Sequence, residues 1–299
     1  MKVLIAGATG LVGRALKVAF DGQGISVTDL VRTSPNIGLP EIEWHPNQGE
    51  IDAAELDGFD AVINLAGESI AAGRWTEGKK KRIRESRIQG TRLLSETLGK
   101  LTTPPAVFLC ASATGIYGDR GKEILDEDSA PGKGFLADVC REWEEATEPA
   151  VSAGVRVVNL RFGPIFSAEG GMLEKLLPPF KLGVGGKIGS GKQYISWVAM
   201  DDVVGAVTFA LENDAVRGPI NIVTPNAVTN NEFTKALGKV LSRPTFFAVP
   251  EFAARLAFGE MADEMLLSSQ RVVPKRLREA GFEFRYPELE GALRHVLSD

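Results

Sequence analysis

The stretch that decides the fold is KVLIAGATGLVG, at residues 2–13 of the 299-residue chain. It opens with a short apolar run that ends in glycine, which is typical of a buried parallel strand. Three glycines follow at G-x-x-G-x-x-G spacing: Gly7, Gly10 and Gly13. Apolar residues at helical spacing then continue to Gly22, and a second strand is expected at 26–31. The start of the chain therefore predicts a β-loop-α-β unit.

A glycine-rich loop between a strand and a helix can hold the pyrophosphate of a dinucleotide. The first glycine permits a tight turn, and the second lets backbone N–H groups approach the pyrophosphate. The third lets the helix pack against the strand, and the phosphates then lie at the positive end of that helix. We therefore predict that Gly7, Gly10 and Gly13 bind a dinucleotide cofactor.

The end of the second strand selects between two cofactors. An acidic residue there binds the adenosine ribose of NAD, whereas an arginine accepts the 2′-phosphate of NADP. The strand is followed by Arg32, which offers the charge, and by Thr33 and Ser34, which offer hydroxyl groups. Asp29 competes, but we expect it to lie within the strand. We predict NADP(H), with NAD(H) as the less favoured alternative.

Strands and helices continue to alternate along the chain. Apolar runs at 61–65, 106–110 and 155–160 are separated by helices expected near 79–101 and 134–153. This alternation predicts an α/β fold, a Rossmann-like doubly wound parallel sheet. After residue 165 we expect loops around Pro178-Pro179 and the glycines at 183–191, then a helix over about 201–212 and a strand at 219–223. The tail from 250 onward predicts short helices and loops.

Composition excludes several classes of protein. Lys and Arg number 34 against 39 Asp and Glu, a net charge of −5, so we expect no nucleic-acid partner. Two cysteines and two histidines are too few for a disulfide scaffold or a zinc site, so we expect no metal. No run of 18 apolar residues is present, which predicts no membrane partner. We expect a cytoplasmic protein.

Several stretches together resemble the extended short-chain dehydrogenases/reductases, the group that includes nucleotide-sugar epimerases and dehydratases. Besides residues 7–13, they are NLAG at 64–67, IQGT at 88–91, ASATGIYG at 111–118, RFGP at 161–164 and WVAMDDV at 197–203. The resemblance implies an NAD(P)-binding epimerase/dehydratase domain over 1–225, with a lobe-forming insert at about 166–200.

One branch of that family is more similar than the others. Trp75, CREWE at 140–144, GSGKQ at 189–193 and the tail with Pro274, Gly281-Phe282 and Tyr286-Pro287 resemble epimerase family proteins labelled cell-division-inhibitor-like. That branch carries a C-terminal domain of unknown function. The resemblance implies such a domain at 248–297, contributing to a smaller C-terminal lobe that caps the substrate.

The resemblance also implies cofactor-binding residues, position by position. They are Gly7, Thr9, Gly10, Leu11, Val12, Gly13, Arg32, Leu65, Ala66, Gly67, Glu68 and Ile165. A basic run at 79–87 follows the 64–67 loop, and within it Arg87 and Arg82 are expected to reach the cofactor phosphates. A solvated helix face and a nucleic-acid contact are the alternatives for this run.

The family's proton relay is missing from the chain. That relay needs a serine and a Tyr-x-x-x-Lys pair, in which the lysine lowers the pKa of the tyrosine and the tyrosine exchanges a proton with the substrate. No tyrosine of this chain precedes a lysine by four residues. Phe135 and Val139 are best placed where the pair belongs, and Ala113 falls on the serine. Tyr117, Thr114 and Ser112 remain as predicted catalytic residues, with a structural role for Tyr117 as the alternative.

Four other features lead to more limited expectations. The loop 186–193 nearly matches a P-loop but lacks the hydroxyl residue, so we expect it to line a substrate cleft with Lys192 and Gln193. Asp201-Asp202 predicts a helix N-cap. The phenylalanines at 246, 247, 252 and 258 are expected in the core, or in part lining the substrate pocket. Cys110 is expected to be inert at the end of a buried strand.

These observations favour an NADP(H)-dependent oxidoreductase or an epimerase-like enzyme that acts on an unknown small polar substrate. The alternative is a non-catalytic NADP(H)-binding redox sensor or regulatory scaffold. The missing Tyr/Lys pair favours the alternative, whereas the cofactor loop and the capping lobe favour the enzyme. The expected partners are a small-molecule substrate and, as an open alternative, a second copy of the chain in a homodimer.

Overall fold

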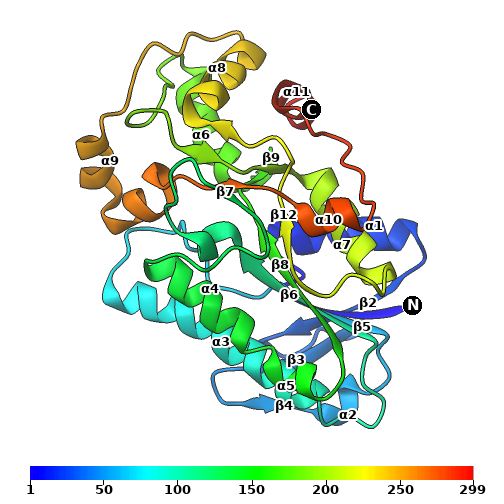
Figure 1. Cartoon of the computed structure of the whole chain (residues 1–299). Helices are drawn as coiled ribbons and strands as arrows, with labels where there is room; N and C mark the ends of the chain where they lie inside the picture. The colour runs from blue at the N-terminus through cyan, green and yellow to red at the C-terminus, as the bar shows by residue number, and fades with distance from the viewer. Residues whose placement is uncertain (299) are drawn as a thin grey trace.

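An eight-stranded sheet in the order β12-β8-β6-β5-β1-β2-β3-β4 forms the centre of the computed structural model, which describes residues 1–298 (Figure 1). Every neighbouring pair is parallel except β3 and β4. The strand order reverses between β1 and β5, and ligands of such sheets bind in the crevice at that point. The predicted Rossmann-like parallel sheet is confirmed.

The strands of this sheet are short and mostly buried. They are β1 (Lys2–Ala6), β2 (Ser26–Val31), β3 (Glu41–His45), β4 (Glu50–Ile51), β5 (Ala61–Asn64), β6 (Val107–Ala113), β8 (Arg156–Phe162) and β12 (Gly218–Ile222). The sequence pattern did not predict β3 and β4, because these two strands at one end of the sheet carry charged residues beside their apolar ones. Strand β6 also continues past Cys110, which therefore lies inside the strand rather than at its end.

Helices cover both faces of the sheet. They are α1 (Leu11–Gly22) and α7 (Met200–Glu212) on one face, and α3 (Glu77–Leu98), α4 (Phe135–Glu145) and α5 (Glu148–Ser152) on the other (Figure 1). Side chains of β1 alternate between the faces: Val3 and Ile5 pack against α1 and α7, and Leu4 packs on the side of α3. This alternation is the period-2 pattern of a strand that is buried on both sides. The short α2 (Ala53–Leu56) precedes β5.

A smaller lobe stands above the carboxyl ends of the strands (Figure 1). Its core joins residues of α6 (Gly171–Lys181), α8 (Asn230–Leu241) and α11 (Leu289–Val296) around Phe166 and Trp197, whose rings stack 5.0 Å apart. The lobe also contains β9 (Ile165–Ser167), β10 (Tyr194–Ile195), β11 (Val198–Ala199), β13 (Val228–Thr229), α9 (Glu251–Phe258) and the π-helix η2 (Ala262–Leu267).

The loop expected at Pro178-Pro179 is wrong, since both prolines lie inside α6. A proline removes one helical hydrogen bond, but its carbonyl still accepts one. The N–H of Leu182 donates to the carbonyl of Pro178 at 3.1 Å. Leu173, Leu177 and Phe180 on the same helix are buried in the lobe core, and this burial offsets the lost bond.

The C-terminal segment returns from the lobe to the sheet. Strand β14 (Arg271–Val272) pairs with β7 (Ile124–Leu125), α10 (Lys275–Glu279) packs against β12, and Phe282 contacts Phe209 of α7. The Asp202 carboxylate accepts the backbone N–H groups of Arg285 at 2.7 Å and Tyr286 at 3.0 Å. The predicted N-cap role of Asp201-Asp202 is therefore wrong: Ala199 occupies the N-cap position of α7 without a side-chain cap, and Asp202 in the first turn binds the C-terminal segment.

Within residues 1–298, no helix is long and apolar enough to cross a membrane. In the same part of the chain, no group of three or more His, Cys, Asp or Glu side chains is arranged to hold a metal ion.

Candidate functional site

The glycine loop lies between β1 and α1, at the point where the strand order reverses. Gly7 has φ of +81°, and a Cβ placed there would lie 2.8 Å from the amide nitrogen of Ala66. A Cβ on Gly13 would lie 2.5 Å from the Gly7 carbonyl oxygen. Any side chain at either position would collide with backbone, so the turn and the close helix packing both require glycine. The loop has the shape that the dinucleotide prediction needs.

Helix α1 begins at Leu11, directly after this loop. Gly10 precedes it without any side-chain cap, so the first N–H groups of the helix remain available to an anion. The Gly10 N–H donates to the Gly7 carbonyl at 3.0 Å, and the Arg14 guanidinium donates to the Thr9 carbonyl at 2.8 Å. These two bonds fix the conformation of the loop directly before the uncapped start of α1.

The next strand over, β2, carries the residues that were predicted to select the cofactor. Asp29 lies within the strand, opposite Ile5, and its carboxylate binds the Lys17 ammonium at 2.6 Å. The carboxylate is nearly buried within the strand and Lys17 binds its Oδ2, so it is not exposed at the strand end as Arg32 is. Arg32 follows the strand and is exposed. This arrangement favours the side chain of Arg32 for contact with the adenosine half.

On the other side of the crevice, the loop after β5 is shaped by Asn64. The Asn64 amide donates to the Thr91 hydroxyl at 2.8 Å, and its oxygen accepts the Ala66 N–H at 3.1 Å. The Trp143 indole also donates to Thr91, at 2.9 Å. These three side chains hold Leu65, Ala66 and Gly67 against the glycine loop. The sequence analysis did not predict Asn64 or Thr91 as site residues. Asn64 could have been found, because it is the polar last residue of an otherwise apolar strand.

The basic run of α3 divides into different environments. The Lys79 ammonium binds the Glu68 carboxylate at 2.7 Å, and Arg82 lies 3.7 Å from the same group. The bond from Lys79 lowers the pKa of Glu68 below its ordinary value. Arg87 instead lies against the 65–68 loop and donates to the backbone carbonyl of Glu68 at 3.0 Å. Arg82 is exposed beside Glu68, and its predicted phosphate contact remains a prediction.

Ile165 begins β9, where the chain leaves the sheet for the lobe. A Cβ on Gly170 would lie 3.2 Å from the Leu11 side chain, and one on Gly171 would lie 3.3 Å from the Ile165 carbonyl oxygen. The start of α1 therefore faces the entrance of the lobe. The structure brings together, at the carboxyl ends of β1 and β5, Gly7, Gly10, Gly13, Leu11, Leu65, Ala66, Gly67 and Ile165. Arg32 follows β2 on one side of β1, and Arg87 contacts Gly67 on the β5 side.

The predicted catalytic residues Ser112 and Tyr117 belong to a buried polar network. The Ser112 hydroxyl donates to the Glu144 carboxylate at 2.7 Å, and Arg161 binds that carboxylate through two nitrogens, each at 2.8 Å. The Arg161 guanidinium also donates to the Tyr117 hydroxyl at 2.9 Å, which in turn donates to the Asn221 amide oxygen at 2.7 Å. The network joins β6, β8 and β12 to α4.

This burial bears on the predicted role of Tyr117 as an acid. Its side chain is 0% exposed, within the 3₁₀ helix η1 (Thr114–Tyr117). Burial raises the pKa of Tyr117 to about 12, since the ionised form would lose its hydration. Both hydrogen-bonding positions of its hydroxyl are already filled by protein groups. Thr114 is also buried, at 3% exposed. The geometry therefore supports the structural alternative for Tyr117.

Phe135 and Val139 stand at the start of α4, where the sequence comparison placed the missing pair. The Trp75 ring meets the Phe135 ring edge-on at 5.2 Å, and the Lys80 ammonium lies over that ring at 5.0 Å. Val139 is buried. The Glu264 carboxylate accepts the N–H groups of Phe135 and Leu136, at 3.1 and 3.2 Å. Apolar and aromatic packing occupies the position of the family's relay, and the C-terminal segment covers it.

Two other expectations are wrong. Gln193 does not point into a cleft: it is buried, and its amide donates to the carbonyls of Ile188 and Leu266, each at 3.0 Å. Lys192 is exposed. The four phenylalanines expected in the core are exposed instead, at 90%, 59%, 72% and 41% for Phe246, Phe247, Phe252 and Phe258. Phe252 and Phe258 lie on the short α9, of which only Ala254 is buried, and Phe246 and Phe247 lie in the irregular segment before it. The alternative that some of the four line the substrate pocket stays a prediction.

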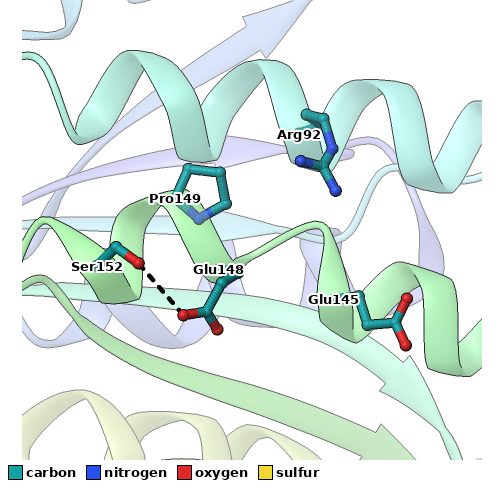
Figure 2. A pocket seen from close by; sticks show the side chains of 5 residues that line it. All are labelled: Arg92, Glu145, Glu148, Pro149 and Ser152. Carbon is teal, nitrogen blue, oxygen red and sulfur yellow. Dashed lines mark hydrogen bonds between the residues drawn. The ribbon is translucent and has the colours of Figure 1, made fainter.

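Two open hollows lie away from the crevice. One, of about 440 Å³, is lined by Arg92, Glu145, Glu148, Pro149 and Ser152 between α3 and the α4–α5 turn (Figure 2). The only dashed contact in Figure 2 joins the Ser152 hydroxyl to Glu148, at 3.2 Å. The second, of about 420 Å³, borders α10. Neither hollow is lined by residues of the glycine loop. The candidate site is therefore identified by the residues around that loop and not by the volume of a cavity.

The profile of the NAD dependent epimerase/dehydratase family matches residues 3–223, most of the chain. The chain belongs to this family. The profile of a domain of unknown function, DUF1731, matches residues 249–296. Both matches agree with the resemblance drawn from the motifs.

Relatives within the family match nearly end to end. An epimerase family protein of Mycobacterium bovis is 43% identical over 294 residues, covering 98% of this chain and 97% of that protein. The human epimerase family protein SDR39U1 is 36% identical and covers 100% of both chains. A crystal structure of human SDR39U1 with NADPH superposes with a TM-score of 0.92, at 33% identity and 100% coverage of both chains.

Proposed function

We propose that this chain binds NADPH across the crevice between β1 and β5 and uses it as a hydride donor to a small polar substrate. The observation that carries the proposal is the turn at Gly7, whose Cβ position is filled by the Ala66 backbone. That close approach, with the uncapped start of α1, makes a cradle for a pyrophosphate. The solved structure of the human relative with NADPH supports the choice of cofactor.

Residues on the two sides of the crevice would bind different parts of the cofactor. The backbone amides at the start of α1 would hold the pyrophosphate, and the exposed Arg32 would bind the 2′-phosphate. The loop of Leu65, Ala66 and Gly67 would support the nicotinamide half, because it borders the glycine loop on the β5 side. When bound, the nicotinamide supplies the hydride chemistry.

Proton transfer would not follow the family's pattern. Phe135 and Val139 carry no proton to give, and Tyr117 and Ser112 are held in the buried network. The side chains would therefore contribute positioning, and a substrate would exchange its proton with solvent. The same observation favours a second candidate function, a redox sensor in which the lobe responds to bound NADPH without turnover.

A single-turnover assay separates the two functions. Protein in excess over NADPH is mixed with fractions of a metabolite extract, and absorbance of the reduced nicotinamide is followed. Binding is measured first, by titration with NADPH and NADH. Consumption of bound NADPH by one fraction supports the enzyme, whereas tight binding without consumption by any fraction supports the sensor. Failure to bind either cofactor would refute both.

A further inference from the structure

Arg87 differs from the other cations of the basic run in having no carboxylate partner. Its Nη1 donates to the backbone carbonyls of Glu68 and Ile83, each at 3.0 Å. Lys79 and Arg82 surround the Glu68 carboxylate, and Arg84 binds Glu142 at 2.9 Å. Arg87 thus forms no salt bridge with a described carboxylate, although its side chain is largely enclosed.

The surroundings of the Arg87 guanidinium fix its position. Its Cζ lies 5.0 Å from the Trp143 ring of α4, and a Cβ on Gly67 would lie only 3.2 Å from it. A guanidinium over an aromatic face is held by its charge as well as by packing. Burial lowers the pKa of Arg87 from its ordinary value, and this effect outweighs the opposing charge of Glu68. The group is therefore preorganised at the edge of the 65–68 loop.

Two of its nitrogens are free to bind a ligand. Nε and Nη2 make no hydrogen bond to any residue among 1–298, and neither belongs to the unpartnered polar atoms that are shut off from solvent. Gly67 continues directly from Ala66, whose backbone touches the Gly7 turn. The free donors therefore lie at the β5 side of the crevice, on the opposite side of β1 from β2 and Arg32.

We infer that Arg87 positions the nicotinamide half of the cofactor, donating from Nε and Nη2 to oxygen acceptors of its ribose or carboxamide, and does not bind the adenosine phosphates. A dinucleotide crosses the crevice with its halves on opposite sides of the strand-order reversal. Arg32 and Arg87 stand on those opposite sides, so they take different halves. This inference rests on the proposed function, and it replaces the phosphate contact expected for Arg87 from the sequence.

Three ligands distinguish contacts to the nicotinamide half of the cofactor from contacts to the adenosine half. They are NADPH, NADH and 2′,5′-ADP, which lacks the nicotinamide half. For Arg87→Met we expect NADPH and NADH to bind about 10-fold more weakly, because charge-assisted hydrogen bonds are lost. The affinity for 2′,5′-ADP should change less than about twofold. Arg32→Ala should show the opposite pattern, weakening NADPH and 2′,5′-ADP together. Emission of bound NADPH should also fall in Arg87→Met, because the ring is held less firmly.

Ser86→Ala is the matched control for a merely structural role. The Ser86 hydroxyl accepts the Glu68 N–H at 3.0 Å, so its removal loosens the loop at the residue that Arg87 also holds. Ser86→Ala should leave all three affinities within about twofold of the unchanged protein. The inference is overturned if Ser86→Ala reproduces the loss, if Arg87→Met weakens 2′,5′-ADP as much as NADPH, or if it weakens neither. If the unchanged protein binds no NADPH, the proposed function falls first and the inference with it.

Discussion

Gly7 and Ala66 touch through their backbones, although 59 positions separate them in the chain: a Cβ on Gly7 would lie 2.8 Å from the Ala66 amide nitrogen. This contact joins the ends of β1 and β5, the two strands at which the order of the sheet reverses. The glycine loop and the 65–68 loop are therefore packed directly against each other.

Gly7→Ala should therefore abolish NADPH binding and destabilise the fold. The new Cβ meets the Leu65–Ala66 backbone, and the φ of +81° is unfavourable for alanine by about 1 kcal/mol or more. Gly24→Ala is the control, because Gly24 has φ of +69° with no atom within 4 Å of the Cβ position. Titration with NADPH and thermal denaturation of both variants measure the difference. Retained binding in Gly7→Ala would contradict the assignment of the cradle.

Arg32→Ala should reduce the preference for NADPH over NADH. A lost charge-assisted contact to the 2′-phosphate corresponds to a ~10- to 100-fold weaker affinity for NADPH, while NADH should be little affected. The two dissociation constants are measured by fluorescence titration at fixed salt. Equal weakening of both cofactors would show that Arg32 contacts something other than the 2′-phosphate.

Tyr117 should make the protein lose stability in alkaline solution. Its pKa is about 12 in the folded chain against 10.0 as the ordinary value, so the folded state holds the proton more tightly. Stability is then full below pH 10 and falls as the pH rises from about 10 toward 12. Urea denaturation of the unchanged protein and of Tyr117→Phe, across pH 8 to 11, should show a shallower decline in the variant. If the free energy of unfolding falls equally with pH in both proteins, the Tyr117 hydroxyl does not have the raised pKa expected from its burial.

Arg161→Met should destabilise the fold by about 3–5 kcal/mol, because it leaves the Glu144 carboxylate buried without its partner. Arg161 binds that carboxylate with two nitrogens, and both side chains are largely enclosed. The double variant Arg161→Met, Glu144→Leu should recover part of the loss, since it removes the stranded charge as well. Urea denaturation measures both. A single variant as stable as the parent would mean that the network contributes nothing to stability.

Asp202→Ala should release the C-terminal segment from α7. Loss of the two bonds to Arg285 and Tyr286 leaves two backbone N–H groups unpaired, at a cost of about 1–3 kcal/mol for each group that stays buried. Hydrogen exchange should quicken at 284–287 more than in β1 or β5. Asp201→Ala is the comparison, because the Asp201 carboxylate binds the His295 ring of α11 at 3.0 Å rather than the backbone of 284–287. If exchange at 284–287 is equally fast in both variants, Asp202 does not specifically hold the C-terminal segment against α7.

Much of the fold followed from local patterns. The strand predicted at 26–31 has the bounds of β2, and the helix expected at 201–212 differs from α7 by one residue. The glycine spacing and the apolar runs are visible within a few positions because a buried strand and its turn are specified locally. The strands β3 and β4 and the lobe helix α8 were not predicted.

The sequence by itself determined the parallel sheet, the glycine loop at its first turn and the absence of the Tyr-x-x-x-Lys pair. Only the tertiary structure decided which polar side chains face the crevice and which are buried. Ser112, Glu144, Arg161, Tyr117 and Asn221 are joined by the register of β6, β8 and β12, and no local pattern reports that register. Arg87 shows the same dependence, because Gly67 and Trp143, which fix its guanidinium, come from other segments of the chain. Hydrogen bonds and close packing between distant residues exist only once the chain has brought their elements together.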